Sequence, residues 1–314
     1  KYGGNKPVVW ALDDCQVIVQ FDKEKMKPLV PEKAKSQVQQ GIRTVFDYLD
    51  SGLLILLGVQ AADKDHVLSI FVPDIQSRLS ANKIASYAAS FGWLNSDVVL
   101  PTVVKELISK FDLISVRDEN SRTIISNNIG VDVPVLQDPT MLYGFDKEIA
   151  DTKVPNGLEE NYLLLYSPGG ISDERYDDLV NYCKYKKLHI VSVGNYHSCA
   201  DINLLTIDPF QWLVLIRKAQ FVVTSSFHGV VFSVKFMKQF ISSPNKASYN
   251  KISSLLHELN LSDRIFYHNE DELTHDDINY STLQPLLDIK IEQSRMTLFK
   301  FLGILVIEPN PPIF

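Results

Sequence analysis

Cysteine is scarce in this sequence, and its spacing is unlike that of a disulfide framework or a metal site. The 314 residues include only Cys15, Cys183 and Cys199, and no CxxC pair is present. This pattern favours a reducing compartment over a secreted, disulfide-stabilised fold. His189 and His197 lie near Cys199 in the sequence, but their spacing fits no familiar metal site, and we expect none.

Long apolar runs and an excess of basic residues are also missing. The longest apolar run near the end, residues 296–307, is interrupted by Lys300 and is too short to span a bilayer. It predicts a buried C-terminal helix or strand and no transmembrane segment, with contact to a membrane surface as the alternative. The formal charge of −7 argues against a protein whose whole surface binds nucleic acid. A local site for a small anion remains compatible with this charge.

Four common catalytic and nucleotide-binding motifs are absent as well. The sequence contains no GxxxxGK(S/T) loop, no HExxH, no GxSxG and no GxGxxG. The main support for P-loop hydrolysis, zinc peptidase chemistry, ordinary serine hydrolysis and the usual dinucleotide fingerprint is therefore missing.

The second half of the chain alternates between short apolar runs and amphipathic segments. Strands are expected at residues 161–167, 188–194, 221–225 and 239–243. Helices are expected between them and after them, at 172–187, 208–219, 228–237 and 247–261, with Asp208 as an N-cap before Pro209. Such alternation predicts a parallel sheet with helices on both faces.

The first half shows the same alternation less clearly. The expected strands are residues 52–60, 66–72, 82–90, 112–116 and 133–137, and the expected helices are 100–111 and 118–130. Asp118 is the expected cap of the second helix and Gly130 its stop. The polar segment 143–161 predicts the domain boundary. We therefore expect an α/β protein with two Rossmann-like domains facing a cleft, at 1–150 and 151–282, followed by a C-terminal helix or tail at 283–314.

The stretch VVTSSFHGVVFS, residues 222–233, places a histidine at a corner between a strand and a helix. In an open parallel sheet, ligands bind beyond the carboxyl ends of the strands, where the next helix presents free backbone N–H groups to anions. Ser225, Ser226 and His228 occupy such a corner, and Gly229 would let the backbone approach a ligand closely. The alternative is a histidine that caps its own helix or packs under a loop, and both interpretations stay open at this point.

A second corner carries an arginine. Arg117 directly follows the strand expected at residues 112–116, where its guanidinium could bind a carboxylate or phosphate. The alternative is a surface ion pair with Asp118, Glu119 or Asp138. For Asp138 itself, in the sequence QDPT, a turn or cap role is expected.

A third corner carries two glycines. Gly169 and Gly170 follow the strand expected at residues 161–167 and resemble a phosphate-binding turn, although PGG is also a common loop sequence.

Several segments taken together resemble one known family. They are IASYAASFG (84–92), FDLISVRDENS (111–121), VPVLQDPTML (133–142), FVVTSSFHGVVFSVKFMKQFI (221–241) and NKISSLLHELNLSDRI (250–265), in this order. The set is similar to the polysaccharide pyruvyl transferase family over roughly residues 80–265. The resemblance implies a two-domain fold like that of GT-B glycosyltransferases, with the N-terminal domain on the acceptor side. It also implies transfer of a pyruvyl group from phosphoenolpyruvate to a sugar, usually as a ketal that bridges two hydroxyls.

The resemblance leads to a set of expected roles. His228 is expected to act as general acid/base or as the partner of the leaving phosphate, and Arg117 to hold an anionic group of the donor. Ser225, Ser226 and the backbone N–H of Gly229 would complete the anion site. Lys246 or Lys251 would add positive charge, with a solvated surface position as the alternative. The resemblance implies phosphoenolpyruvate as the donor substrate, and no cofactor is expected.

The resemblance further implies a sugar acceptor, free or lipid-linked, and a cytoplasmic location near the inner face of the membrane. Two other functions are compatible with the sequence. One is a GT-B-type glycosyltransferase that uses a nucleotide-sugar, and the other is a catalytically degenerate relative that binds a glycan.

Overall fold

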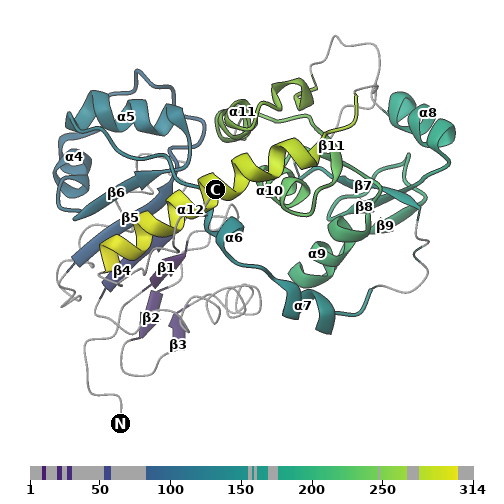
Figure 1. The fold of residues 1–314 in the computed structure, drawn as a ribbon, viewed down its shortest axis with the longest axis horizontal. Coiled ribbons are helices and arrows are strands. Elements are labelled where there is room, and N and C mark those ends of the chain that lie inside the picture. The colour runs from purple at the N-terminus through teal and green to yellow at the C-terminus, as the bar shows by residue number, and fades with distance from the viewer. Residues whose placement is uncertain are drawn as a thin grey trace, which may run out of the picture. The chain divides into compact units, whose positions relative to one another are not determined.

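The chain forms two compact units, each built on a parallel β-sheet (Figure 1). The computed structural model describes residues 9–11, 20–22, 27–29, 53–57, 83–154, 158, 161–168, 176–246, 248–266 and 276–302. Unit 1 comprises Lys1–Leu142 and Leu287–Phe314, and unit 2 comprises Tyr143–Leu286. The predicted α/β class with two Rossmann-like sheets is thus confirmed, whereas the predicted cleft concerns the relative placement of the units and stays a prediction.

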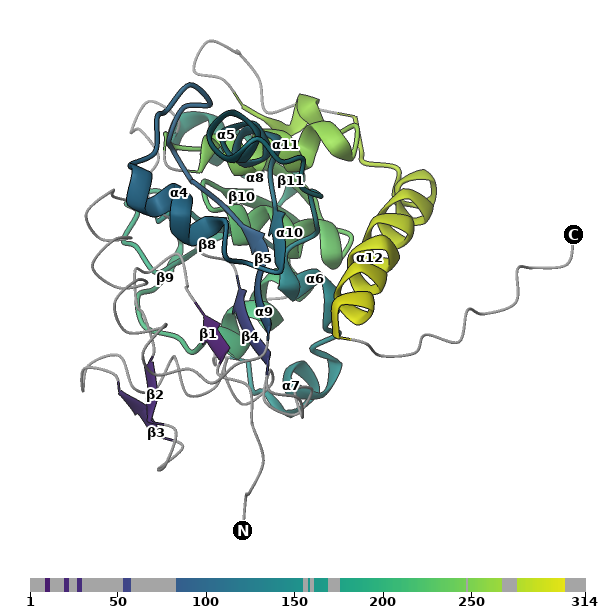
Figure 2. The same ribbon diagram turned by 90° about the vertical axis from the view of Figure 1, so that its left-hand side faces the viewer.

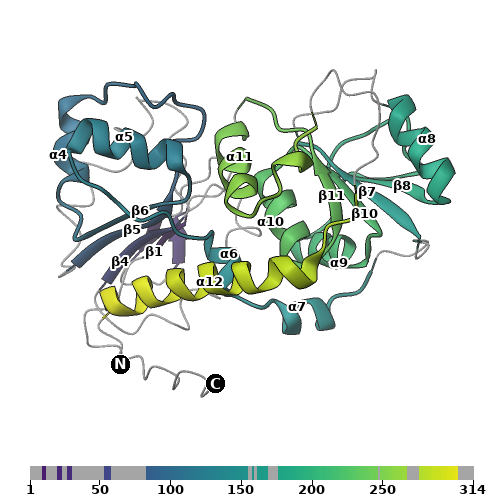
Figure 3. The same ribbon diagram turned by 45° about the horizontal axis from the view of Figure 1, so that its top comes forward.

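Unit 1 contains a four-stranded parallel sheet. Its order is β1 (Val9–Ala11), β4 (Leu53–Leu57), β5 (Lys83–Ala89) and β6 (Leu113–Val116), and β2 (Gln20–Asp22) pairs separately with β3 (Lys27–Leu29) (Figure 2). Helices α4 (Thr102–Ile108) and α5 (Glu119–Ile129) lie on the same face of the sheet (Figure 3). An apolar cluster holds this layer together through Leu94, Leu100, Val104 and Ile124.

The local signals around α5 act as the sequence predicts. The carboxylate of Asp118 accepts a hydrogen bond from the backbone N–H of Ser121 at 2.7 Å. Gly130 ends the helix with φ 79°, a left-handed conformation that glycine adopts without strain, and its N–H donates to the Ser126 carbonyl. Both helix boundaries are therefore confirmed.

The prediction of a strand at residues 133–137 is wrong. Only Val135 forms an isolated parallel bridge, to Val116. Pro134 has no N–H to donate, so its contribution is the carbonyl that accepts from Val116, while the N–H of Leu136 donates to the Val116 carbonyl. The chain then enters the short helix α6 (Pro139–Leu142). The strand expected at 66–72 lies outside the part of the chain that the structure describes.

Unit 2 contains a five-stranded parallel sheet, and its alternating side chains pack against helices on both faces. The order is β11 (Gln239–Ser242), β10 (Phe221–Thr224), β7 (Tyr162–Tyr166), β8 (His189–Val193) and β9 (Ile202–Leu204). Helix α8 (Tyr176–Lys186) lies on one face of the sheet and α9 (Pro209–Lys218) on the other (Figure 3). Leu163 and Leu165 pack with apolar residues of α8, whereas Tyr162 donates its hydroxyl to the Leu215 carbonyl of α9 at 2.7 Å. The strand β9 was not expected from the sequence.

The start of α9 confirms its predicted cap. Asp208 accepts hydrogen bonds from the backbone N–H groups of Phe210 and Gln211, and the Gln211 side chain accepts from the Asp208 N–H, which completes a capping box before Pro209. For α8, the two candidate caps Ser172 and Asp173 lie outside the described residues.

The long helix α12 (Tyr280–Leu302) begins in unit 2 and ends in unit 1. In unit 1 the hydroxyl of Ser294 accepts a hydrogen bond from the backbone N–H of Gln137 at 2.9 Å. The apolar run starting at residue 296 is helical as far as Leu302, with side chains that are mostly half-buried up to Phe301. Among the residues described, no helix is long and apolar enough to cross a bilayer.

Candidate functional site

The corner predicted around His228 lies at the carboxyl end of β10, which pairs with β7 on one side and β11 on the other. Two residues separate β10 from helix α10 (Phe227–Lys235), and the second of them, Ser226, is the N-cap residue of the helix. His228 is the second residue of this helix, half-buried, and its ring packs edge-on against Phe227 with centroids 5.5 Å apart. The structure therefore places the histidine in the first turn of a helix at the ligand-binding edge of a parallel sheet.

Ser225 is held from two directions. Its hydroxyl accepts a hydrogen bond from Ser167, which follows β7, at 2.9 Å, and its carbonyl accepts one from the Ser248 hydroxyl, also at 2.9 Å. Only 2% of Ser225 is exposed. Ser226 is more exposed, and its side chain makes no capping hydrogen bond to α10. Of the two serines, Ser226 is thus the better placed to contact a ligand.

Position 229 must be glycine for a packing reason that the sequence did not reveal. A Cβ atom added to Gly229 would lie 2.1 Å from Oγ1 of Thr224 and 2.8 Å from its Cβ. The Thr224 hydroxyl in turn donates to the carbonyl of Tyr166 at 2.6 Å and accepts from the N–H of Ser226. The missing side chain therefore makes room for Thr224, whereas the predicted approach of the Gly229 backbone to a ligand stays a prediction.

We expect Gly229→Ala to lower the free energy of unfolding by about 1–3 kcal/mol. In most helices this change stabilises by about 1 kcal/mol through helix propensity, but here the overlap with the buried Thr224 outweighs that gain. Chemical denaturation measures the difference. Gly144→Ala is the control, because the one tight contact of its added Cβ, at 3.1 Å, is with the carboxylate end of the exposed Asp146, and the backbone N of Asp146 lies at an ordinary 4.0 Å. A stabilised Gly229→Ala protein would contradict the packing described.

The remaining residues predicted for this corner have mixed outcomes. Lys246 is exposed. Lys251, for which a solvated position was the alternative, is instead buried on α11 (Tyr249–Glu258), with 2% of its surface exposed. Gly169 and Gly170 lie outside the described residues. Nothing in the composition of residues 247–261 distinguishes this buried lysine from an exposed one, which is why sequence analysis left its position open.

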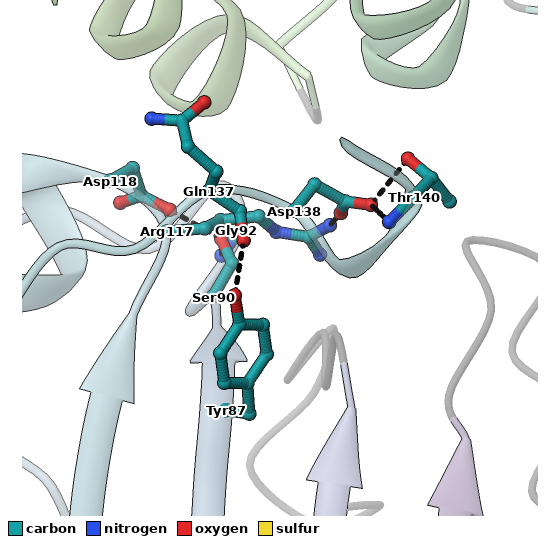
Figure 4. A network of polar contacts seen from close by, with 8 residues as sticks. All are labelled: Tyr87, Ser90, Gly92, Arg117, Asp118, Gln137, Asp138 and Thr140. Atoms are coloured by element: carbon teal, nitrogen blue, oxygen red, sulfur yellow. Dashed lines mark hydrogen bonds and ion pairs between the residues drawn. The ribbon is translucent and has the colours of Figure 1, made fainter. Parts of the chain in front are cut away.

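Arg117 lies in unit 1, at the carboxyl end of β6, and its guanidinium is engaged by Asp138 (Figure 4). The Nη1 atom donates to Oδ2 of Asp138 at 2.8 Å, and only 2% and 3% of the two side chains are exposed. The ion pair that was the alternative interpretation is present, but it is buried rather than on the surface. Because a buried charge needs a partner, this pair is a structural element of unit 1 whatever else Arg117 binds.

Asp138 also begins α6. Its Oδ1 accepts hydrogen bonds from the backbone N–H and the hydroxyl of Thr140, so the predicted cap role is confirmed. Tyr87 on β5 donates its hydroxyl to the Gln137 carbonyl at 3.1 Å (Figure 4). Burial and the nearby charge of Asp138 raise the pKa of Tyr87 well above its usual value, so the phenol stays a hydrogen-bond donor.

A second polar contact at the same edge was missed by sequence analysis. The hydroxyl of Ser90, just after β5, donates to the Asp118 carboxylate at 2.7 Å and accepts from the N–H of Gly92 (Figure 4). The strand pairing is irregular here, and Ala88 has φ 49°. A hydroxyl at the last position of a predicted strand was the available signal, as it was for Ser225.

The site residues thus fall into two groups. Ser225, Ser226, His228 and Gly229 form one corner in unit 2, and Arg117 and Asp138 belong to unit 1. Within the described ranges, no group of three or more histidine, cysteine or acidic side chains is arranged to hold a metal ion.

A family model decides to which proteins the chain is related. The model of the polysaccharide pyruvyl transferases matches residues 48–246, which is more than half of the 314 residues. The chain belongs to this family. In this pyruvyl transferase relative, the matched region includes both corners, the one that carries Arg117 and the one that carries His228.

The family member also resembles solved structures at low identity. The UDP-GlcNAc 2-epimerase of Methanocaldococcus jannaschii is 11% identical, with 86% of this chain and 80% of that chain covered and a TM-score of 0.45. MnaA of S. aureus with UDP is 14% identical, with 88% and 82% covered and a TM-score of 0.44. The E. coli trehalose-6-phosphate structure bound with UDP-2-fluoro glucose is 13% identical, with 86% and 77% covered and a TM-score of 0.48. With scores this low, the fold assignment rests on the two sheets themselves. A search of curated protein sequences gave no match.

Proposed function

We propose that this protein transfers a pyruvyl group from phosphoenolpyruvate to two hydroxyls of a glycan sugar, forming a ketal. The observation that carries the proposal is that the family match includes a half-buried histidine in the first turn of α10, at the carboxyl end of a parallel strand. This position offers backbone N–H groups for an anion beside a side chain that can carry a proton.

The reaction places three demands on the site. The methylene carbon of phosphoenolpyruvate takes up a proton while one sugar hydroxyl adds to C2 and loses its own proton. The oxygen of a second hydroxyl then displaces the phosphate from C2, and its proton leaves to a base or to the departing phosphate. The site must therefore bind two anionic groups, move protons and stabilise the leaving phosphate.

The residues of unit 2 can meet these demands. His228 is assigned the proton transfer, either to the methylene carbon or to the leaving phosphate. The N–H groups of the first turn of α10 and the hydroxyl of Ser226 are assigned to the phosphate oxygens, since a helix N-terminus favours negative charge. Lys246, exposed shortly before α11, is assigned a supporting positive charge. Arg117 of unit 1 is assigned to an anionic group of the donor, in addition to its ion pair with Asp138. Substitutions of Arg117 and Asp138, singly and together, test whether it has this second role.

The first experiment is a thermal-shift titration of the full chain with phosphoenolpyruvate, UDP and GDP. A ligand that binds only the folded state raises the melting temperature according to its concentration relative to Kd, and at 100 times Kd it adds about 2.7 kcal/mol. We expect phosphoenolpyruvate to raise the melting temperature, and we expect UDP and GDP to leave it unchanged. Stabilisation by a nucleotide alone would replace the proposal with glycosyl transfer, and stabilisation by none of the three would favour a degenerate glycan-binding relative.

A further inference from the structure

Two exposed tyrosines lie at the carboxyl edge of the unit 2 sheet. Tyr196 comes three residues after the end of β8, with 70% of it exposed, and Tyr249 is the first residue of α11, with 41% of it exposed. Neither phenol makes a hydrogen bond to another residue within the described ranges. Single exposed aromatic residues are common on protein surfaces, so exposure alone does not identify a site. What distinguishes these two is the backbone that carries them.

The loop that carries Tyr196 is fixed on both sides of the tyrosine. Before it, the side chain of Asn195 donates a hydrogen bond to the Ser167 carbonyl at 2.8 Å. After it, the N–H of His197 donates to the side chain of Asn203, and the amide of Asn203 donates back to the His197 carbonyl. A tyrosine on a fixed backbone loses little conformational freedom when it binds a ligand, because only two side-chain torsions remain to be ordered. The loop therefore presents a rigid aromatic surface to solvent.

A row of hydrogen bonds joins this loop to the start of α11. Asn195, after β8, donates to the carbonyl of Ser167, after β7. The Ser167 hydroxyl donates to the hydroxyl of Ser225, after β10, at 2.9 Å. The Ser225 carbonyl accepts from the hydroxyl of Ser248, the N-cap residue of α11, also at 2.9 Å. Each exposed tyrosine is the next residue in sequence after one end of this row, and Ser225, inside the row, lies three positions before His228.

The row is too long for one sugar ring to reach both tyrosines. Its members Asn195, Ser167 and Ser225 follow three neighbouring strands of the sheet, β8, β7 and β10. Neighbouring strands are about 4.8 Å apart, so these three anchors alone extend over about 10 Å. Phosphoenolpyruvate and a monosaccharide are both shorter than the whole row. A ligand that contacts both tyrosines is therefore a chain of several rings.

The chemistry of the two tyrosines suits sugar rings better than nucleobases. A pyranose ring carries C–H groups on its faces, and an aromatic ring binds them through apolar contact and through the negative charge of its own face. A nucleobase also stacks on an aromatic ring, but its selective recognition requires polar groups along its edge. The amides of Asn195 and Asn203, which anchor the Tyr196 loop, already donate to backbone carbonyls. The surroundings of Tyr196 thus favour a ligand that is bound by its face.

We propose that Tyr196 and Tyr249 are stacking platforms for an oligosaccharide acceptor, one on each side of the His228 corner. This inference rests on the proposed function for the reaction at the corner, and it names the acceptor class as a chain of sugars rather than a monosaccharide. The sugar between the platforms is the one whose hydroxyls reach His228, and its neighbours in the chain stack on the tyrosines. Any contacts that the N-terminal domain makes with the acceptor are additional to these.

The test compares trisaccharides with monosaccharides of glucose, galactose, mannose and N-acetylglucosamine, each titrated calorimetrically into the full chain. We expect at least one trisaccharide to bind more tightly than its monosaccharide. Tyr196→Ala and Tyr249→Ala should each weaken that trisaccharide by about 3- to 30-fold, because apolar contact and ring stacking are lost. Tyr196→Phe keeps the ring and should retain the affinity. Tyr185→Ala, at an exposed position of α8, is the matched control and should change nothing.

Release of phosphate from phosphoenolpyruvate with the same sugars separates this inference from the proposed function. Release with an unchanged acceptor KM in both alanine variants would overturn the platforms and leave pyruvyl transfer standing. Trisaccharide binding that depends on the tyrosines, without phosphate release, would keep the platforms and overturn the transfer. Equal binding of trisaccharides and monosaccharides, or no binding of either, would overturn the inference. So would UDP binding that Tyr196→Ala weakens while trisaccharide binding stays unchanged.

Discussion

Replacing His228 with glutamine is expected to lower the rate of pyruvyl transfer by about 10²–10⁴-fold, the range usual for loss of a general acid or base. Glutamine keeps hydrogen-bonding capacity and approximate size at the second position of α10, but it cannot exchange a proton. Because the anion-binding N–H groups of the helix remain, affinity for phosphoenolpyruvate should change far less than turnover. Release of inorganic phosphate from phosphoenolpyruvate, measured with a panel of diol-bearing sugars as acceptors, gives the rate.

Two further measurements make the His228 result interpretable. His257→Gln, at an exposed position of α11, is the matched control and should retain full turnover. The melting temperature of His228→Gln without ligand should match that of the wild type, since the imidazole is only half-buried. A folded His228→Gln protein with nearly full turnover would contradict the assignment of proton transfer to this residue.

Replacing Arg117 with methionine is expected to lower the free energy of unfolding by about 3–5 kcal/mol. The change leaves the carboxylate of Asp138 buried without the guanidinium that lies 2.8 Å away in the wild type. In the double variant Arg117→Met with Asp138→Asn, the buried negative charge is gone while an amide oxygen can still cap α6, so most of the loss should be recovered. Chemical denaturation of the wild type, the two single variants Arg117→Met and Asp138→Asn, and the double variant gives the coupling free energy between the two side chains.

The same variants separate the ion pair from a role in donor binding. If Arg117 also binds the donor, the double variant regains stability but still binds phosphoenolpyruvate more weakly than the wild type does. If the ion pair is its only role, stability and phosphoenolpyruvate affinity recover together. If the single variant Arg117→Met loses less than about 1 kcal/mol of unfolding free energy, the ion pair behaves like one on the surface, which contradicts the buried pair described.

The alternation of elements was predictable because each element carries its own signal. Asp208 with Pro209 marked the start of α9, and Asp118 with Gly130 marked both ends of α5, since caps act on backbone groups within three or four residues. The strand expected at residues 133–137 failed because an apolar run is ambiguous when a proline removes a donor from its middle. The single strand β9 was missed because three half-buried residues give too short a pattern.

The sequence by itself determined the fold class, the corner that carries His228, and the family to which the corner belongs, because periodicity, caps and motifs are local properties of the chain. Only the tertiary structure decided what surrounds each candidate residue. Asp138 reaches Arg117 across 21 positions of the sequence, and Ser248 reaches Ser225 across 23. Thr224 occupies the space that Gly229 leaves, and Lys251 is buried against Phe227. Burial and pairing depend on which elements pack together, and a charge that looks solvated in the sequence acquires its chemical role only when that packing removes it from water.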